Sequence, residues 1–333
     1  MYHFCTLFDK NYFTRGLALY ESLRQHCSDF HLYIFCFDED SFETLSDLHL
    51  PHMTLISLAA FEDAELLSVK SDRTKAEYCW TSTPSTILYV LKNYQVPSCT
   101  YVDADIYFYS NPAVLIEEMQ QSVILLTEHR YTARYDNAHL SGRFCVQFMT
   151  FKNQPDSLEA LNWWRQACLA WCYNRVEDGK FGDQKYLDDW CTRFSGVHIS
   201  EHLGGGIAPW NVQQYHFLKK TDKLECVFRA QTGDVIFYHF HGLKLYRKLR
   251  ADLGQYQLNS NVIKWIYLPY LKHLYNISKK LESKLENPFV DAFAVEPTWI
   301  QCLKRFAKGS FNILNLERSF ENVRINNFAN PLR

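Results

Sequence analysis

The first third of the chain alternates apolar runs rich in aromatic and β-branched residues with segments of helical periodicity. Residues 3–8 and 30–37 are typical of buried strands, and residues 13–26 between them repeat apolar side chains at helical spacing. A strand–helix–strand unit places its two strands in one sheet and parallel to each other. The alternation therefore predicts an α/β fold with a mostly parallel central sheet.

The same alternation continues further along the chain. We expect more strands at 53–56, 99–108, 122–127 and 143–151, and more helices at 42–48, 85–94 and 156–175. Pro84 stands near the start of the helix predicted at 85–94, a position where proline is tolerated.

Beyond residue 250 the character of the sequence changes. A basic helical pattern covers residues 261–284, and the chain is weakly patterned from Glu286 onwards. We therefore predict a main domain at 1–250 and a helical C-terminal extension at 251–333.

Composition excludes some classes of protein. The 333 residues are 47% hydrophobic with a formal net charge of -2, so charge gives no reason to expect nucleic acid as a partner. The N-terminal residues lack the basic and apolar regions of a signal peptide, and no apolar run is long enough to span a bilayer. The 11 cysteines contain no C-x-x-C pair, which argues against a thiolate zinc site and favours free thiols in a reducing cytoplasm.

Two aspartates, Asp103 and Asp105, interrupt the apolar run at 99–108. Side chains two residues apart in a strand point to the same side, so two negative charges would lie next to each other. Ligands of open α/β sheets bind beyond the carboxyl ends of the strands, and paired carboxylates there suit Mg²⁺ or Mn²⁺. The alternative interpretation is a pair of exposed aspartates at the end of a strand.

Polar residues also follow a second apolar run, where His239 and His241 are succeeded by Gly242 and Lys244. An imidazole can complete a Mn²⁺ site, and a lysine can neutralise a diphosphate. Both histidines point to the same side of a strand, so periodicity cannot choose between them. The alternative for each is a hydrogen-bonded core residue.

Three segments together resemble nucleotide-sugar glycosyltransferases of the GT-A fold, closest to glycosyltransferase family 8 and related bacterial enzymes. They are "TLFDKNYFTRGLALYESL" at 6–23, "YVDADIYF" at 101–108 and "HFHGLK" at 239–244. Shorter pieces agree with them: "LTEHR" at 126–130, "FGDQKYL" at 181–187 and "GGGIAPWN" at 204–211. The resemblance runs from about residue 3 to residue 246. It implies a GT-A catalytic domain with a mixed central sheet.

The resemblance also implies roles for individual residues. Metal ligands for Mn²⁺ (or Mg²⁺) would be Asp103, Asp105 and His239. The nucleoside of a nucleoside-diphosphate sugar, a UDP-sugar, would contact Thr6, Leu7, Asp9, Asn11 and Tyr12. Groups near the diphosphate would be Asp103, Gly242 and Lys244, and Lys75 or Arg73 would substitute for a helix arginine of the family that has no clear match here. The donor sugar would meet Asp183 and Gln184 as catalytic residues. The acceptor would be a glycan or lipid-linked glycan of the cell envelope, and transfer would retain the anomeric configuration.

Some residues depart from the family pattern. The segment 142–153 resembles a Gly-x-x-Asn-x-Gly motif that lines the sugar pocket, but has Cys145 and Gln147 at the polar and small positions. Lys244 follows Gly242 by two residues, where the family has three. A non-catalytic nucleotide-sugar or glycan-binding protein on a decayed transferase scaffold is therefore the rival hypothesis. A nucleotidyltransferase would need a glycine-rich basic loop, for which the segment 6–16 is a poor candidate.

The basic pattern in the C-terminal extension has two interpretations. Lysines alternate with apolar and aromatic residues at Lys264, Lys272, Lys279, Lys280 and Lys284. Such a segment can lie on an anionic membrane, which would make the protein peripheral to the inner face of the cytoplasmic membrane. Alternatively, it is a helix that packs on the main domain and leaves its lysines in solvent.

Overall fold

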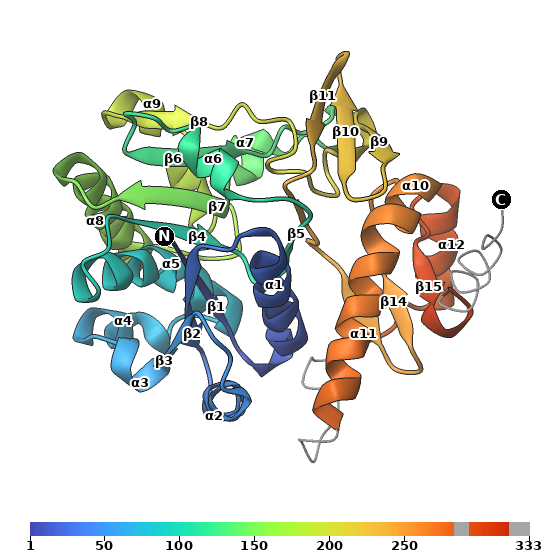
Figure 1. Cartoon of the computed structure of the whole chain (residues 1–333), viewed down its shortest axis with the longest axis horizontal. Coiled ribbons are helices and arrows are strands. Elements are labelled where there is room, and N and C mark those ends of the chain that lie inside the picture. Colours follow the sequence, from blue (N-terminus) through green and yellow to red (C-terminus); the bar gives the residue numbers. More distant parts are fainter. Residues whose placement is uncertain (283–292, 320–333) are drawn as a thin grey trace.

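The computed structural model describes residues 1–282 and 293–319. A central seven-stranded sheet has the order β3-β2-β1-β4-β7-β6-β8 (Figure 1). Its strands are β1 (Tyr2–Phe8), β2 (Phe30–Cys36), β3 (Met53–Ser57), β4 (Ser98–Val102), β6 (Ile124–Glu128), β7 (Phe144–Lys152) and β8 (Val197–Ile199). Strands β1 to β4 are mutually parallel, β7 is antiparallel to β4 and β6, and β8 is parallel to β6. The α/β class and the mixed sheet are confirmed.

Helices cover both faces of this sheet (Figure 1). They are α1 (Phe13–His26), α2 (Glu39–Leu48), α3 (Leu58–Phe61), α4 (Ala64–Lys70), α5 (Lys75–Asn93), α6 (Ala113–Glu117), α7 (Ala138–Ser141), α8 (Pro155–Ala170) and α9 (Trp190–Arg193). In β1, Phe4 and Phe8 join a core cluster with residues of α1, whereas Cys5 and Leu7 join a second cluster with residues of α5 and α8. The two-residue period of the strand therefore buries both of its faces.

Helix α5 begins ten residues earlier than predicted. Thr74 and Glu77 form a capping box in which Glu77 accepts from the Thr74 amide at 2.8 Å. Pro84 consequently lies inside the helix, where it removes one backbone hydrogen bond. The start predicted at residue 85 was wrong, because the cap and the burial of this helix outweigh the cost of one internal proline.

The predicted strand at 99–108 is divided in two. Strand β4 ends at Val102, a turn holds Asp103 to Asp105, and β5 (Ile106–Phe108) leaves the central sheet. Strand β5 pairs antiparallel with β12 (Phe237–His239), with His239 opposite Ile106. The turn between β4 and β5 therefore lies at the end of β12, which brings two distant segments of the sequence together.

The second half of the chain adds smaller elements. A three-stranded sheet contains β9 (His216–Lys219), β10 (Leu224–Phe228) and β11 (Gln231–Asp234), and another contains β13 (Lys244–Tyr246), β14 (Arg250–Asp252) and β15 (Ile313–Asn315). The helices are α10 (Ser260–Val262), a π-helical turn (Ile263–Tyr267), α11 (Leu268–Glu282) and α12 (Trp299–Ala307).

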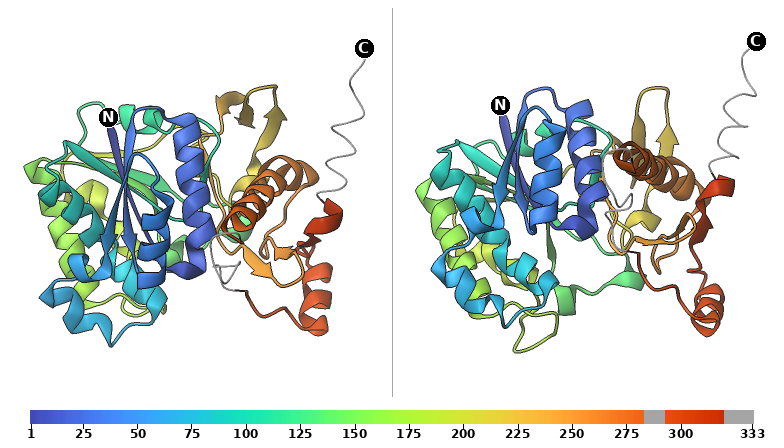
Figure 2. Two further views of the ribbon diagram at one scale, coloured as in Figure 1. Left: turned by 60° about the horizontal axis from the view of Figure 1, so that its bottom comes forward. Right: turned by 90° about the horizontal axis from the view of Figure 1, so that it is seen from below.

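Helix α11 lies beside α1 (Figure 1, Figure 2). Its Tyr270, Leu271 and Leu274 are buried in the same core cluster as residues of α1, and its lysines are exposed. Packing on the main domain therefore describes this segment up to Glu282, and Lys284 lies outside the described residues. The division into two parts at residue 250 stays a prediction.

Two other expectations concern the whole described chain. The eleven cysteines, all within the described residues, are unpaired. Within residues 1–282 and 293–319, no helix combines the length and apolar character needed to cross a bilayer.

Candidate functional site

The turn that holds Asp103 and Asp105 is attached to two neighbouring segments. The amide of Asp103 donates to the carbonyl of Gln147 in β7 at 3.0 Å. The carbonyl of Asp105 accepts from the amide of Phe240, directly after β12, at 2.9 Å. Both aspartates are therefore held between β7 and the end of β12.

His239 completes an acidic cluster with these two residues. Its Nε2 lies 3.1 Å from Oδ1 of Asp105 and 3.6 Å from Oδ2 of Asp103, and one ligand atom from each residue fits within 4.8 Å of the others. Adjacent ligands around a small six-coordinate cation are about 3 Å apart. Two carboxylates and an imidazole are suitable ligands for Mn²⁺, so this set fits a divalent cation with little movement.

The remaining atoms of the cluster have protein partners. The hydroxyl of Tyr101 donates to Oδ1 of Asp103 at 3.1 Å. Nδ1 of His239 lies 2.8 Å from Oε1 of Gln147, a pairing in which Nδ1 carries the proton. This arrangement directs Nε2 of His239 towards the two aspartates.

Burial and charge shift the pKa values of the cluster. Burial raises the pKa of Asp103 to about 6, although the positive charge of His239 acts in the opposite direction. Burial would also raise the pKa of Asp105, but the charge of His239 and its hydrogen bond outweigh this and hold the pKa at about 2. Burial alone would lower the pKa of His239, yet Asp105 raises it well above its usual value. The metal-free cluster is thus held together by a charged His239–Asp105 pair.

Asp183 and Gln184 lie at the start of a short 3-10 helix, Gln184–Leu187. The indole of Trp164 donates to the Asp183 carbonyl at 2.9 Å and fixes its backbone. Burial raises the pKa of the Asp183 carboxyl to about 8, and the negative charge of Asp103 acts in the same direction. The Asp183 carboxyl is therefore close enough to Asp103 for the two negative charges to interact.

The N-terminal turn follows β1 at the edge of the same region. Asp9 accepts from the amide of Asn11 at 2.9 Å and from its side chain at 2.7 Å, which orders the turn. Tyr12 is 43% exposed and is therefore not a core residue. Thr6 and Leu7 are buried in β1, and the Thr6 hydroxyl has no hydrogen-bond partner among the described residues.

Arg15 is a candidate that sequence reasoning missed. It is only 5% exposed, and its guanidinium donates to the carbonyls of Asn11 and Leu243, each at 3.4 Å. The guanidinium also lies 4.7 Å from the centre of the Tyr12 ring and helps to lower the pKa of Asp105. Arg15 thereby joins the N-terminal turn to the segment after His239. Its position on the buried face of α1, where arginine is rare, was the available signal.

The other predicted residues are on the surface. Gly242 has a φ of 76°, a left-handed conformation that favours glycine, and a Cβ there would meet no atom within 4 Å. Lys244 is exposed at the start of β13, and Lys75 is exposed in the first turn of α5. Within the described residues, the side chains of Lys244 and Gln184 make no hydrogen bond or ion pair, so no such bond joins either of them to the acidic cluster.

The segment 204–211 lies directly beside β12. Ile207 bridges to Tyr238, and the carbonyl of Ile207 accepts from the His239 amide at 3.0 Å. A Cβ on Gly204 would come within 1.8 Å of the Asp234 carbonyl oxygen, so only glycine fits this approach. The Trp210 ring then packs at 5.4 Å from both His239 and His241. This segment therefore forms one wall of the candidate site.

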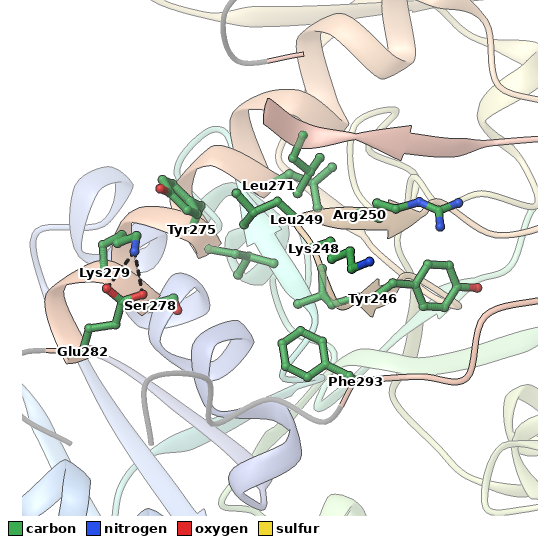
Figure 3. A pocket seen from close by; sticks show the side chains of 13 residues that line it. Tyr246, Lys248, Leu249, Arg250, Leu271, Tyr275, Ser278, Lys279, Glu282 and Phe293 are labelled. Carbon is green, nitrogen blue, oxygen red and sulfur yellow. Dashed lines mark hydrogen bonds and ion pairs between the residues drawn. The ribbon is translucent and has the colours of Figure 1, made fainter. Parts of the chain in front are cut away.

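A separate pocket of about 240 Å³ lies between α11 and the β13–β14 hairpin (Figure 3). Its lining is mainly apolar and includes Leu245, Leu249, Leu271 and Leu274. No residue of the acidic cluster contributes to it. The pocket is therefore separate from the acidic cluster.

Comparison with known proteins begins with sequence. No family model matches the chain. It is 32% identical over 298 residues to the uncharacterized protein YfnD of Bacillus subtilis, covering 88% of this chain and 94% of YfnD. It is also 32% identical over 250 residues to the uncharacterized YfnF of the same organism, covering 73% of this chain and 82% of YfnF. The chain belongs to the YfnD–YfnF family.

Solved structures identify the fold of this YfnD–YfnF family member. A structure of the galactosyltransferase LgtC with donor and acceptor sugar analogs matches with a TM-score of 0.50 and 11% identity, covering 85% of this chain and 100% of LgtC. An active-site mutant of LgtC matches with a TM-score of 0.51, 10% identity and the same coverage. The chain thus has the GT-A fold found in glycosyltransferases, and the fold predicted from the sequence is confirmed.

Proposed function

We propose that the chain is a metal-dependent glycosyltransferase that transfers a sugar from a UDP-sugar to a glycan or lipid-linked glycan in the cytoplasm, with retention of configuration. The observation that carries the proposal is the convergence of Asp103, Asp105 and His239 within 4.8 Å in a GT-A fold. Two neighbouring carboxylates repel each other, and a bound divalent cation would offset this repulsion.

Each candidate residue has a defined task in this proposal. Asp103, Asp105 and His239 would hold the cation, Mn²⁺ or Mg²⁺, which would supply positive charge to stabilise the leaving diphosphate. The turn Asp9–Tyr12 and the end of β1 bind the nucleoside. Arg15 braces this turn against the segment of Gly242 and Lys244, where the diphosphate would lie.

Asp183 and Gln184 orient the donor sugar. The raised pKa of about 8 supports a neutral Asp183 carboxyl in the free protein, able to donate a hydrogen bond to a sugar hydroxyl. In a retaining reaction the leaving phosphate can itself receive the acceptor proton, so the proposal requires no separate carboxylate base.

One observation favours the rival hypothesis of a non-catalytic nucleotide-sugar-binding protein. Gln147 stands where the family motif has a small residue, and its buried side chain occupies space beside His239. Less room for a donor sugar would allow nucleotide binding without transfer.

A UDP-release assay tests the proposal. The purified chain is incubated with a panel of UDP-sugars, with Mn²⁺ or with a chelator. We expect Mn²⁺-dependent UDP release from at least one donor, and loss of release but retention of UDP binding in Asp183→Asn. Tight UDP binding without release from any donor would instead support the rival hypothesis.

A further inference from the structure

Exposed apolar side chains are concentrated in one short part of the chain. Six of the fourteen exposed large hydrophobic residues of the described chain lie within residues 295–311, and the other eight are scattered singly. These six are Val295, Trp299, Ile300, Leu303, Phe306 and Phe311. Single exposed apolar residues are ordinary, but a contiguous group indicates a binding surface.

Four of these residues lie on helix α12, which presents its apolar side to solvent. Trp299, Ile300, Leu303 and Phe306 are 72%, 48%, 59% and 75% exposed. Their spacing of three to four residues places them on one side of the helix. A surface helix normally turns this side towards the core.

The polar side of α12 is the side that holds it to the protein. Arg305 donates to Asp252 at 2.5 Å, and Asp252 is only 1% exposed. At about 100° per residue, Arg305 lies about 120° short of two full turns from Trp299, whereas Leu303 lies about 40° beyond one turn. Arg305 therefore projects away from the apolar side. The amphipathicity of α12 is therefore reversed, because a buried ion pair anchors the helix and the tryptophan and phenylalanine face outwards.

The charged residues of α12 itself are all basic. Lys304 and Lys308 are exposed, and α12 contains no acidic residue. Exposed Arg134 donates to the carbonyl of Lys308 at 3.2 Å, which adds a third cation at the C-terminal end of the helix. A short helix with Trp, Leu and Phe on one side and flanking lysines has the composition of an interfacial membrane helix.

We propose that the exposed face of α12, defined by Trp299, Ile300, Leu303 and Phe306 with Lys304 and Lys308, binds the surface of an anionic membrane. The apolar side chains enter the headgroup region, and the lysines contact lipid phosphates. A second copy of the chain would bring the same positive charges against each other, so charge favours the membrane. The proposal does not depend on sugar transfer, and it locates membrane contact on α12 and not on the lysine-bearing segment at 261–284.

Cosedimentation of the full chain with lipid vesicles tests this surface. We expect binding to vesicles of phosphatidylglycerol mixed equally with phosphatidylcholine, weak binding to phosphatidylcholine alone, and weaker binding at high salt. The double variant Leu303→Ser/Phe306→Ser should lose at least tenfold in affinity. Lys304→Ala/Lys308→Ala should lose roughly 30-fold on anionic vesicles only.

The matched control is Leu67→Ser/Leu218→Ser, which removes two other exposed leucines and should bind vesicles like the wild type. Circular dichroism and UDP binding should be unchanged in all variants, which separates this proposal from the proposed function. Equal binding by the α12 variants would overturn the proposal. So would the absence of vesicle binding, or a dimer in light scattering that the serine variants convert to a monomer.

Discussion

Oε1 of Gln147 lies 2.8 Å from Nδ1 of His239, across 92 positions of sequence. Metal-binding histidines commonly donate their second ring nitrogen to such an acceptor, which fixes the tautomer that ligates. The glutamine that departs from the family motif can therefore position His239, the proposed third metal ligand. Nε2 of Gln147 is buried and has no hydrogen-bond partner in the described residues. The side chain of Gln147 therefore contacts the cluster through its oxygen.

Two replacements of Gln147 test whether its oxygen positions His239. Gln147→Leu removes the acceptor at similar volume and should weaken Mn²⁺ binding about 10- to 100-fold, whereas Gln147→Glu should retain affinity because a carboxylate also accepts from Nδ1. Mn²⁺ affinity can be followed by electron paramagnetic resonance. Wild-type Mn²⁺ affinity in Gln147→Leu, or equal losses in Gln147→Leu and Gln147→Glu, would refute a positioning role.

Arg15 provides a second test. Its guanidinium donates to carbonyls of the N-terminal turn and of Leu243, so Arg15→Met should disorder the nucleotide side of the site. Hydrogen bonds from charged groups contribute about 1.5–3 kcal/mol, and we expect UDP affinity to fall at least tenfold. Arg24→Met on the exposed side of the same helix is the control and should bind UDP normally. Equal UDP affinities of the two variants in calorimetry would show that Arg15 does not support nucleotide binding.

The contact between α1 and α11 predicts a dependence of stability on pH. Nε2 of His273 lies 2.5 Å from Glu21, and this hydrogen bond lowers the pKa of the Glu21 carboxyl despite the opposing effect of burial. A carboxyl whose pKa is lower in the folded state than in the unfolded state stabilises the fold at pH values above its unfolded-state pKa. This contribution is lost as the pH falls through the folded-state pKa.

Glu21→Gln should therefore lower the free energy of unfolding by about 1 kcal/mol or less at neutral pH. The difference from wild type should vanish once the pH is well below 4.5, the ordinary glutamate value. Thermal unfolding at a series of pH values measures this, with exposed Glu43→Gln as a control. A difference that persists in acid would mean that the side chain acts through packing and not through charge.

The fold could be predicted from the sequence because the patterns that indicate its strands and helices are local. The apolar runs of β1 and β2 and the helical spacing between them appear within 35 residues. The capping box at Thr74 and Glu77 was equally local and was missed because Pro84 was taken as a boundary. The break between β4 and β5 was not readable, since it depends on the pairing of β5 with β12.

The site was predictable only in part, for the same reason. Asp103 and Asp105 are only two positions apart in the sequence, and the family resemblance supplied His239. The contacts of Gln147 and Arg15 join residues 92 and 228 positions apart, so only the three-dimensional structure connects them. The reversed orientation of α12 depends likewise on the non-local pair of Arg305 with Asp252.

The central claim is that Asp103, Asp105 and His239 bind a cation on which nucleotide binding depends. Isothermal calorimetry of UDP binding, with Mn²⁺ and with a chelator, tests it most directly. The account predicts Mn²⁺-dependent UDP binding by the wild type and by the exposed control Asp222→Asn, and its loss in Asp103→Asn and Asp105→Asn, with all four proteins folded. Full Mn²⁺-dependent UDP affinity in both site variants would contradict it.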